Sequence, residues 1–109
     1  MSDQTRTTGL IVALDTQSPA QASQWAQEIG PAAGMLKLGM EFAYAAGFQA
    51  VADVAGGRPL FLDLKLHDIP NTVGSAVRAL SYLRPRMLTL HAGGGRAMME
   101  AARKACDEA

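Results

Sequence analysis

The chain has 109 residues, of which 49% are apolar and 18% are charged, and its formal net charge at pH 7 is +0. This length allows one domain at most, and the composition is ordinary for a globular α/β protein. A balanced charge creates no basic field for nucleic acid or an anionic membrane, and no apolar run approaches the roughly 20 residues that span a bilayer. The sequence therefore predicts no nucleic-acid partner and no membrane segment.

The beginning of the chain is polar and lacks the apolar stretch of a signal peptide. We predict that residues 1–8 form a disordered end and that residues 9–109 form the folded part. The single cysteine, Cys106, excludes an internal disulfide bond and fits a reducing cytosol. We therefore expect a cytoplasmic protein.

Four apolar runs are spaced regularly along the chain. They open at Leu10, Met35, Leu60 and Met87, so that successive starts lie 25, 25 and 27 residues apart. Strand-like runs that alternate with helical patterns at such a period indicate repeated βα units and a parallel sheet. We therefore predict four β-strands, each followed by helical structure.

The segments between these runs show the helical spacing of apolar residues. The first helix is predicted to have Ser18 as its N-cap and Pro19 in its first turn, and to end at Gly30. Residues 41–55 predict a short helix and then a longer one, with an interruption at Gly47. The two later helices are indicated by residues at spacing i, i+3, i+4 and i+7, namely Val73, Ala76, Val77 and Leu80, and Met98, Ala101, Ala102 and Ala105.

The predicted arrangement, (βα)4, corresponds to half of a TIM-type (β/α)8 barrel, because a complete barrel typically needs about 250 residues. The sequence stops at Ala109 directly after a helical pattern. We therefore predict that residues 9–109 are the amino-terminal half of a barrel, truncated after its fourth helix. Four parallel strands alone would leave two edges and an apolar inner face uncovered, so we expect further chain or a second molecule to cover them.

The charged residues are concentrated in the stretch with the sequence DLKLHDIPNT, residues 63–72. Alternation along a strand places Asp63 and Lys65 on the same face, and Asp68 can fold back over them from the turn at Pro70. Carboxylates on either side of an amine favour the ionised state of all three groups. The pattern therefore predicts a lysine that is placed as a proton donor within a negative field.

Other polar residues also fall at the ends of predicted strands, where the functional groups of a TIM barrel lie. Asp15 follows the first strand, Lys37 lies in the second and His91 ends the fourth. A charged group at an inward strand position costs desolvation free energy unless it is paired or used. A structural ion pair explains any one of these residues equally well, but the repetition over four strands favours a functional site.

These segments together resemble the orotidine 5'-phosphate decarboxylase family. DLKLHDIPNT is similar to the signature of that family, and residues 9–15, 36–41 and 88–94 resemble its first, second and fourth strands. The resemblance implies a TIM barrel that converts orotidine monophosphate to UMP and carbon dioxide, the last step of pyrimidine nucleotide synthesis. It implies no cofactor and no metal ion.

The resemblance also implies a role for individual residues. Lys65 would protonate the carbanion that remains after carbon dioxide leaves, and the charge of Asp63 would favour loss of the substrate carboxylate. Asp68 would enter the pocket of the neighbouring subunit of a homodimer. The implied catalytic residues are therefore Asp63, Lys65 and Asp68.

The implied substrate-binding residues include the catalytic three and five others. Asp15 and Lys37 resemble the pair that holds the ribose hydroxyls. Ile69 and Thr72 resemble residues that line the partner's site, Thr72 through its hydroxyl group. Asn71 is either part of the same site or only the cap of the third helix.

Two other functions remain open. A Mg²⁺-dependent sugar-phosphate decarboxylase or aldolase of the same superfamily shares the D-x-K-x-x-D element. Such enzymes, however, carry a metal-binding Glu where this chain has Lys37, and they continue the element with Ala-Gly instead of Ile-Pro-Asn-Thr. The second alternative is a catalytically silent half-barrel that serves as a scaffold.

Overall fold

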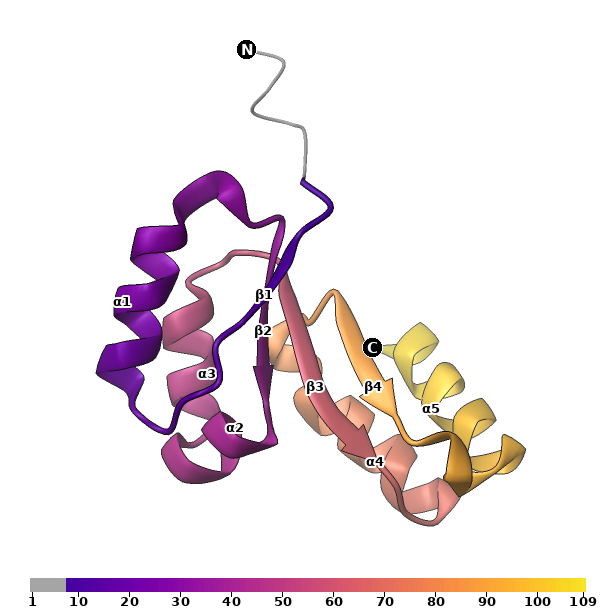
Figure 1. Ribbon diagram of the computed structural model, residues 1–109. Helices are drawn as coiled ribbons and strands as arrows, with labels where there is room; N and C mark the ends of the chain where they lie inside the picture. The colour runs from indigo at the N-terminus through magenta and orange to yellow at the C-terminus, as the bar shows by residue number, and fades with distance from the viewer. Residues whose placement is uncertain (1–7) are drawn as a thin grey trace.

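The computed structural model describes residues 8–109 and contains one parallel sheet (Figure 1). Its strands β1 (Ile11–Ala13), β2 (Met35–Gly39), β3 (Leu60–Leu66) and β4 (Met87–Leu90) lie side by side in chain order. Each neighbouring pair is parallel, so the chain crosses over from the end of one strand to the start of the next. The prediction of four parallel strands is confirmed.

Helices make each of these crossovers and also follow the last strand, as the sequence pattern predicts. They are α1 (Pro19–Ile29), α2 (Met40–Ala46), α3 (Phe48–Ala55), α4 (Pro70–Leu80) and α5 (Arg96–Glu108), with short 3-10 helices η2 (Gly30–Ala32), η3 (Ser81–Leu83) and η4 (Ala92–Gly94). The predicted interruption at Gly47 separates α2 from α3. Its φ of 94° is a conformation that glycine adopts without steric cost.

The two ends of α1 show why its position could be predicted. The side-chain oxygen of Ser18 accepts a hydrogen bond from the amide of Gln21 at 3.1 Å, which satisfies one free donor of the first turn. Pro19 occupies the first turn, where no donor is needed. The helix ends at Gly30, whose φ of 53° lies in the left-handed region.

The core of the molecule lies between the helices and one face of the sheet. Alternate strand residues on that face are buried at 2% exposure or less, among them Leu36, Leu38, Leu60 and Leu62. The residues between them point to the opposite face, where Ile11 is 45% exposed and Met87 is 40% exposed. The predicted apolar inner face is therefore present, and Ile11 and Met87 leave part of it exposed.

A second group of buried side chains packs α4 against α5. It consists of Val73, Val77, Met98, Ala102 and Ala105, with Leu66, Leu88 and Leu90 of the sheet against it. These residues include most members of the two helical stripes that the sequence pattern predicted. The stripes are helix-packing surfaces, as expected.

The predicted disordered end, residues 1–8, lies almost entirely outside the described residues. Only Thr8 is described, and its hydroxyl donates a hydrogen bond to the carbonyl of Ala32 at 3.0 Å. In the described part of the chain, no helix has the length and apolar character needed to cross a membrane.

We expect Ser18→Ala to lower the free energy of unfolding by about 1 kcal/mol, because an amide in the first turn of α1 would lose its acceptor. Equilibrium unfolding in urea measures this change. Ser23→Ala is the matched control, since Ser23 is an exposed residue within the same helix and alanine is the better helix former. Equal losses for the two variants would contradict the role of the cap.

Candidate functional site

Asp63 is the one buried side chain that is polar or charged among residues 8–109, with 8% exposure. Its carboxylate accepts hydrogen bonds from side chains on three adjacent strands. The ammonium of Lys37 on β2 lies 3.2 Å from Oδ2, while the ammonium of Lys65 on β3 lies 2.9 Å from Oδ1. The hydroxyl of Thr89 on β4 donates to the same Oδ1 at 2.8 Å. We call these four residues the Asp63 group.

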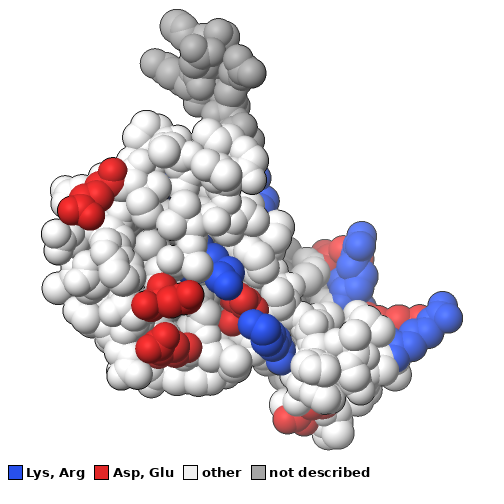
Figure 2. Space-filling view, viewed as in Figure 1, with Lys and Arg blue, Asp and Glu red and all other residues white. Residues whose placement is uncertain are grey.

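The surroundings of Asp63 hold its carboxyl in the ionised form. Its pKa is lowered to about 2, chiefly by the hydrogen bond from Lys65 and further by those from Thr89 and Lys37, against the opposing effect of burial. One carboxylate therefore lies between two ammonium groups, and the excess of positive charge suits an anionic ligand. Figure 2 shows basic and acidic side chains next to one another near the middle of this face, and a second mixed group at its right edge.

The backbone of Lys65 has an unusual conformation. Its φ of 50° places a residue other than glycine in the left-handed region, at a cost of roughly 1–2 kcal/mol. The register between β3 and β4 shifts between Leu62 and Leu66, so the regular ladder is interrupted at this point. The predicted alternation therefore breaks within β3, although the side chains of Lys65 and Asp63 still meet.

Asp68 lies in the loop after β3 and does not join the Asp63 group. Its Oδ1 accepts a hydrogen bond from the backbone amide of the next residue, Ile69, at 2.7 Å. No ion pair between Asp68 and Lys65 occurs in the part of the chain that the structure describes. The predicted fold-back of Asp68 over Asp63 and Lys65 is therefore not seen in the single chain, because the local amide holds the carboxylate at the start of α4.

The other predicted site residues lie on the surface around the sheet end. Asp15 is exposed in the loop after β1, and Ile69 and Thr72 are exposed at the start of α4. The N-cap of α4 is Ile69, and Asn71 lies within the first turn. The alternative that Asn71 caps this helix is therefore wrong, since Pro70 takes the first helical position and the cap is Ile69, two residues before Asn71.

The sequence pattern did not predict two contacts of the site. Thr89 was not identified as a partner of Asp63, although its place in β4, two residues before His91, put it on the inward face. The rings of His67 and His91 stack with centroids 4.6 Å apart and planes 15° apart. His91 also accepts a hydrogen bond at Nδ1 from the amide of Gly93 at 2.9 Å, so it shapes the turn before α5.

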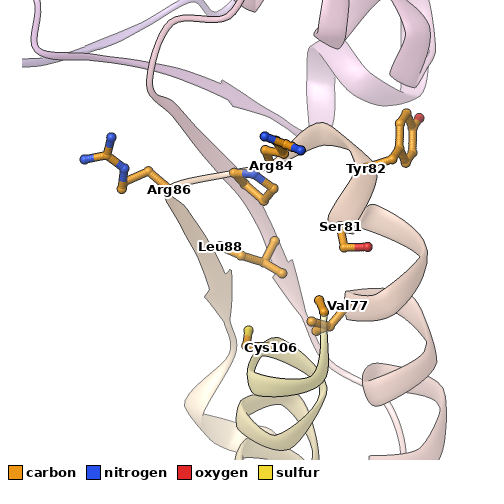
Figure 3. Close-up of a pocket in the computed structure, with 9 residues that line it drawn as sticks. Val77, Ser81, Tyr82, Arg84, Arg86, Leu88 and Cys106 are labelled. Atoms are coloured by element: carbon orange, nitrogen blue, oxygen red, sulfur yellow. The ribbon is translucent and has the colours of Figure 1, made fainter.

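A large open cavity of about 730 Å³ lies at the other end of the sheet (Figure 3). It is lined by parts of α4, η3, β4 and α5, and its polar residues include Arg84, Arg86 and Cys106. Figure 3 shows the side chain of Arg86 turned away from the other lining residues. Because this cavity adjoins the start of β4, it is separate from the Asp63 group. Catalytic groups of α/β barrels follow the carboxyl ends of the strands instead.

Comparisons with known proteins find relatives that match most of this chain. The family model described as "Orotidine 5'-phosphate decarboxylase / HUMPS family" matches residues 8–109. The orotidine 5'-phosphate decarboxylase of Gluconobacter oxydans is 50% identical over 104 residues, which is 95% of this chain and 44% of that protein. The crystal structure of the enzyme of that name from Lactobacillus acidophilus is 39% identical with a TM-score of 0.80, and the match covers 88% of this chain and 44% of that one.

A more distant structure shows the same fold. Orotidine 5'-monophosphate decarboxylase from Methanocaldococcus jannaschii, complexed with the inhibitor BMP, is 16% identical and has a TM-score of 0.86 over 94% of this chain and 49% of that one. The chain thus spans about half the length of the curated relatives it matches, and its βα units form half of a TIM barrel, as predicted. The match over residues 8–109 shows that the chain belongs to the orotidine 5'-phosphate decarboxylase / HUMPS family.

Proposed function

We propose that the whole protein to which this chain belongs is an orotidine 5'-phosphate decarboxylase, which forms UMP and carbon dioxide without a cofactor. The observation that carries the proposal is the ammonium of Lys65, 2.9 Å from the buried carboxylate of Asp63 in β3. The names of the relatives from Gluconobacter oxydans and Lactobacillus acidophilus support the same activity.

Lys65 and Asp63 have complementary parts in this reaction. Loss of carbon dioxide breaks a carbon–carbon bond and leaves its electron pair on a ring carbon, with no cofactor to delocalise the charge. The ammonium of Lys65 stabilises that charge and then transfers one proton to the carbon. Lys65 is left as a neutral amine. Asp63 is ionised, since its pKa is about 2, and its charge disfavours the bound carboxylate and favours neutral carbon dioxide.

Lys37 and Asp15 are proposed to hold the ribose hydroxyls of the substrate. The side chain of Lys37 is 29% exposed, and its ammonium retains donors beyond the one given to Asp63. Ala13 of β1 pairs with Lys37 of β2, and Asp15 follows two residues later in the chain. The two side chains are therefore brought to the same end of neighbouring strands. There a ribose diol could accept a hydrogen bond from Lys37 and donate one to Asp15.

We also propose a two-fold dimer in which Asp68, Ile69 and Thr72 line the pocket of the partner subunit, with Asn71 beside them. Among the described residues Asp68 has no hydrogen bond or ion pair with the Asp63 group, and the apolar side chain of Ile69 is 64% exposed. Both observations are accounted for if this loop is covered by a second subunit. A two-fold contact is reciprocal, so each subunit would both donate and receive the loop.

The metal-dependent alternative is disfavoured by the position of Lys37. Its ammonium lies 3.2 Å from Oδ2 of Asp63, where it competes with any cation for that carboxylate. The scaffold alternative is disfavoured by the intact Asp63 group, because a buried charge with no function is a cost to the fold. The cytoplasmic location stays a prediction.

In the full-length protein, we expect Lys65→Ala to lower turnover by roughly 10²–10⁴-fold or more, because the reaction would lose its proton donor. The rate of UMP formation measures this loss. Lys104→Ala is the matched control, since Lys104 is an exposed lysine of α5 far along the chain from the site. Near-normal decarboxylation by Lys65→Ala would show that another group supplies the proton.

The 109-residue chain by itself is expected to have no useful activity. By family resemblance, the loops that grip the substrate phosphate belong to the second half of the barrel. Binding energy from such a remote group lowers the barrier at the reacting carbon, so its loss depresses turnover as well as affinity. The assay compares UMP formation by the purified chain and by the full-length protein at equal concentration. A turnover number within the usual enzymatic range, about 1–10³ s⁻¹, would refute this expectation.

Two inactive variants are expected to restore activity to each other when they are mixed as full-length subunits. Asp68→Ala and Lys65→Ala damage groups that the dimer proposal assigns to different subunits of one site. Random exchange makes about half of the dimers mixed, and each mixed dimer has one intact site of two, so recovery is about a quarter of the unsubstituted activity. UMP formation after subunit exchange measures the recovery.

The matched control for this mixing experiment is Lys65→Ala with Asp63→Ala. These two residues lie 2.9 Å apart in one chain, so each mixed dimer would still have a defect in both sites and no activity would return. If the first mixture also stayed inactive, although heterodimers had formed, Asp68 would serve its own subunit.

A further inference from the structure

We infer that Thr89 is a positioning residue of the active site, whose hydroxyl joins the backbone of Lys65 to the carboxylate of Asp63 and so fixes the position of the proton donor. The inference builds on the proposed decarboxylase function. It assigns to Thr89 no contact with the substrate.

The directions of the two hydrogen bonds of Thr89 follow from the chemistry of its partners. The backbone amide of Lys65 can only donate, so the oxygen of Thr89 accepts from it at 2.8 Å. The ionised carboxylate of Asp63 can only accept, so the hydroxyl donates to its Oδ1, also at 2.8 Å. A hydroxyl group can do both at once, whereas an apolar side chain of the same shape could do neither.

Thr89 replaces a partner that the sheet does not provide. The register between β3 and β4 shifts between Leu62 and Leu66, and Lys65 within this segment has the left-handed φ of 50°. Its amide binds the side chain of Thr89 in place of a backbone carbonyl of β4. A strained backbone persists only where its surroundings hold it, and the Thr89 hydroxyl is one such constraint.

Burial does not hold the side chain of Lys65, which is 55% exposed and has a flexible four-carbon stem. Its two ends are held instead. The backbone amide is bound by Thr89, and the ammonium is bound by Oδ1 of Asp63, the same oxygen that accepts from Thr89. Removal of the Thr89 hydroxyl would therefore free the backbone amide of Lys65 and remove one of the two donors that hold Oδ1 of Asp63. The ammonium of Lys65 would then be bound to a carboxylate with fewer constraints, while the Lys37 contact to Oδ2 would remain.

The test is the pair Thr89→Val and Thr89→Ser in the full-length protein. Valine keeps the shape of threonine and lacks the hydroxyl, whereas serine keeps the hydroxyl. We expect Thr89→Val to lower kcat by roughly ten- to a hundredfold with little change in KM, because the proton donor is misplaced while substrate contacts remain. Thr89→Ser should restore kcat to within about threefold of the unsubstituted value.

The pH dependence supplies a second measurement. The Thr89 hydrogen bond is one cause of the low pKa of Asp63, so its loss should raise that pKa. Activity that needs ionised Asp63 would then fall off at a higher pH in Thr89→Val than in the unsubstituted protein. Carbon-13 NMR of the Asp63 carboxyl group follows the same titration without any turnover.

The carboxyl titration separates this inference from the proposed function. If the full-length protein forms no UMP, the proposed function fails, and the Asp63 titration still decides whether the Thr89 contact exists. Ser81→Ala, which removes a hydroxyl at the other end of α4, controls for a general loss of stability. If circular dichroism shows that Thr89→Val does not fold, Thr89→Ala takes its place beside Thr89→Ser.

The inference is overturned by either of two results. Unchanged kcat and unchanged Asp63 titration in Thr89→Val would show that the hydroxyl positions nothing. A loss of kcat that Thr89→Ser does not rescue would show that Thr89 acts only through its shape.

Discussion

The buried carboxylate of Asp63 is the constraint on which the rest of the site depends. A buried charge is costly unless it is paired and hydrogen-bonded, and here the compensating groups come from β2, β3 and β4. They converge because the three strands are parallel neighbours, and the register between β2 and β3 places Gly39 opposite Asp63. A Cβ atom at Gly39 would lie 3.2 Å from the carbonyl oxygen of Asp63, so a glycine allows this close approach.

The same strand serves the core and the site through its two faces. Leu62 and Leu64, on either side of Asp63 in sequence, are 0% and 4% exposed, and they anchor β3 to the helices. The rigid packing of that face fixes the backbone from which Asp63 projects to the other face. Within β3, Lys65 has a positive φ, and a polar contact to Thr89 takes the place of the ladder there.

The sequence predicted what depends on local pattern and missed what depends on contacts across strands. The apolar period indicated the parallel sheet, Ser18 marked the start of α1, and alternation brought Asp63 to Lys65. The bond from Thr89 to Asp63 joins residues 26 apart, and it rests on a register shift that no local pattern encodes. Asp68 was misplaced for the single chain because the amide of its neighbour competes for its carboxylate.

This chain forms half of a barrel, and that half contains all four residues of the Asp63 group. The Asp63 group is complete within β2–β4, so the proposed proton transfer depends on one half of the fold. The face that carries it is open, and the Lys65 side chain is 55% exposed to water. Water screens the attraction between Lys65 and Asp63, and its exclusion strengthens every charge interaction inside a site. Any segment that covers the inner face would therefore strengthen the interaction between Lys65 and Asp63, whose geometry is already set within this chain.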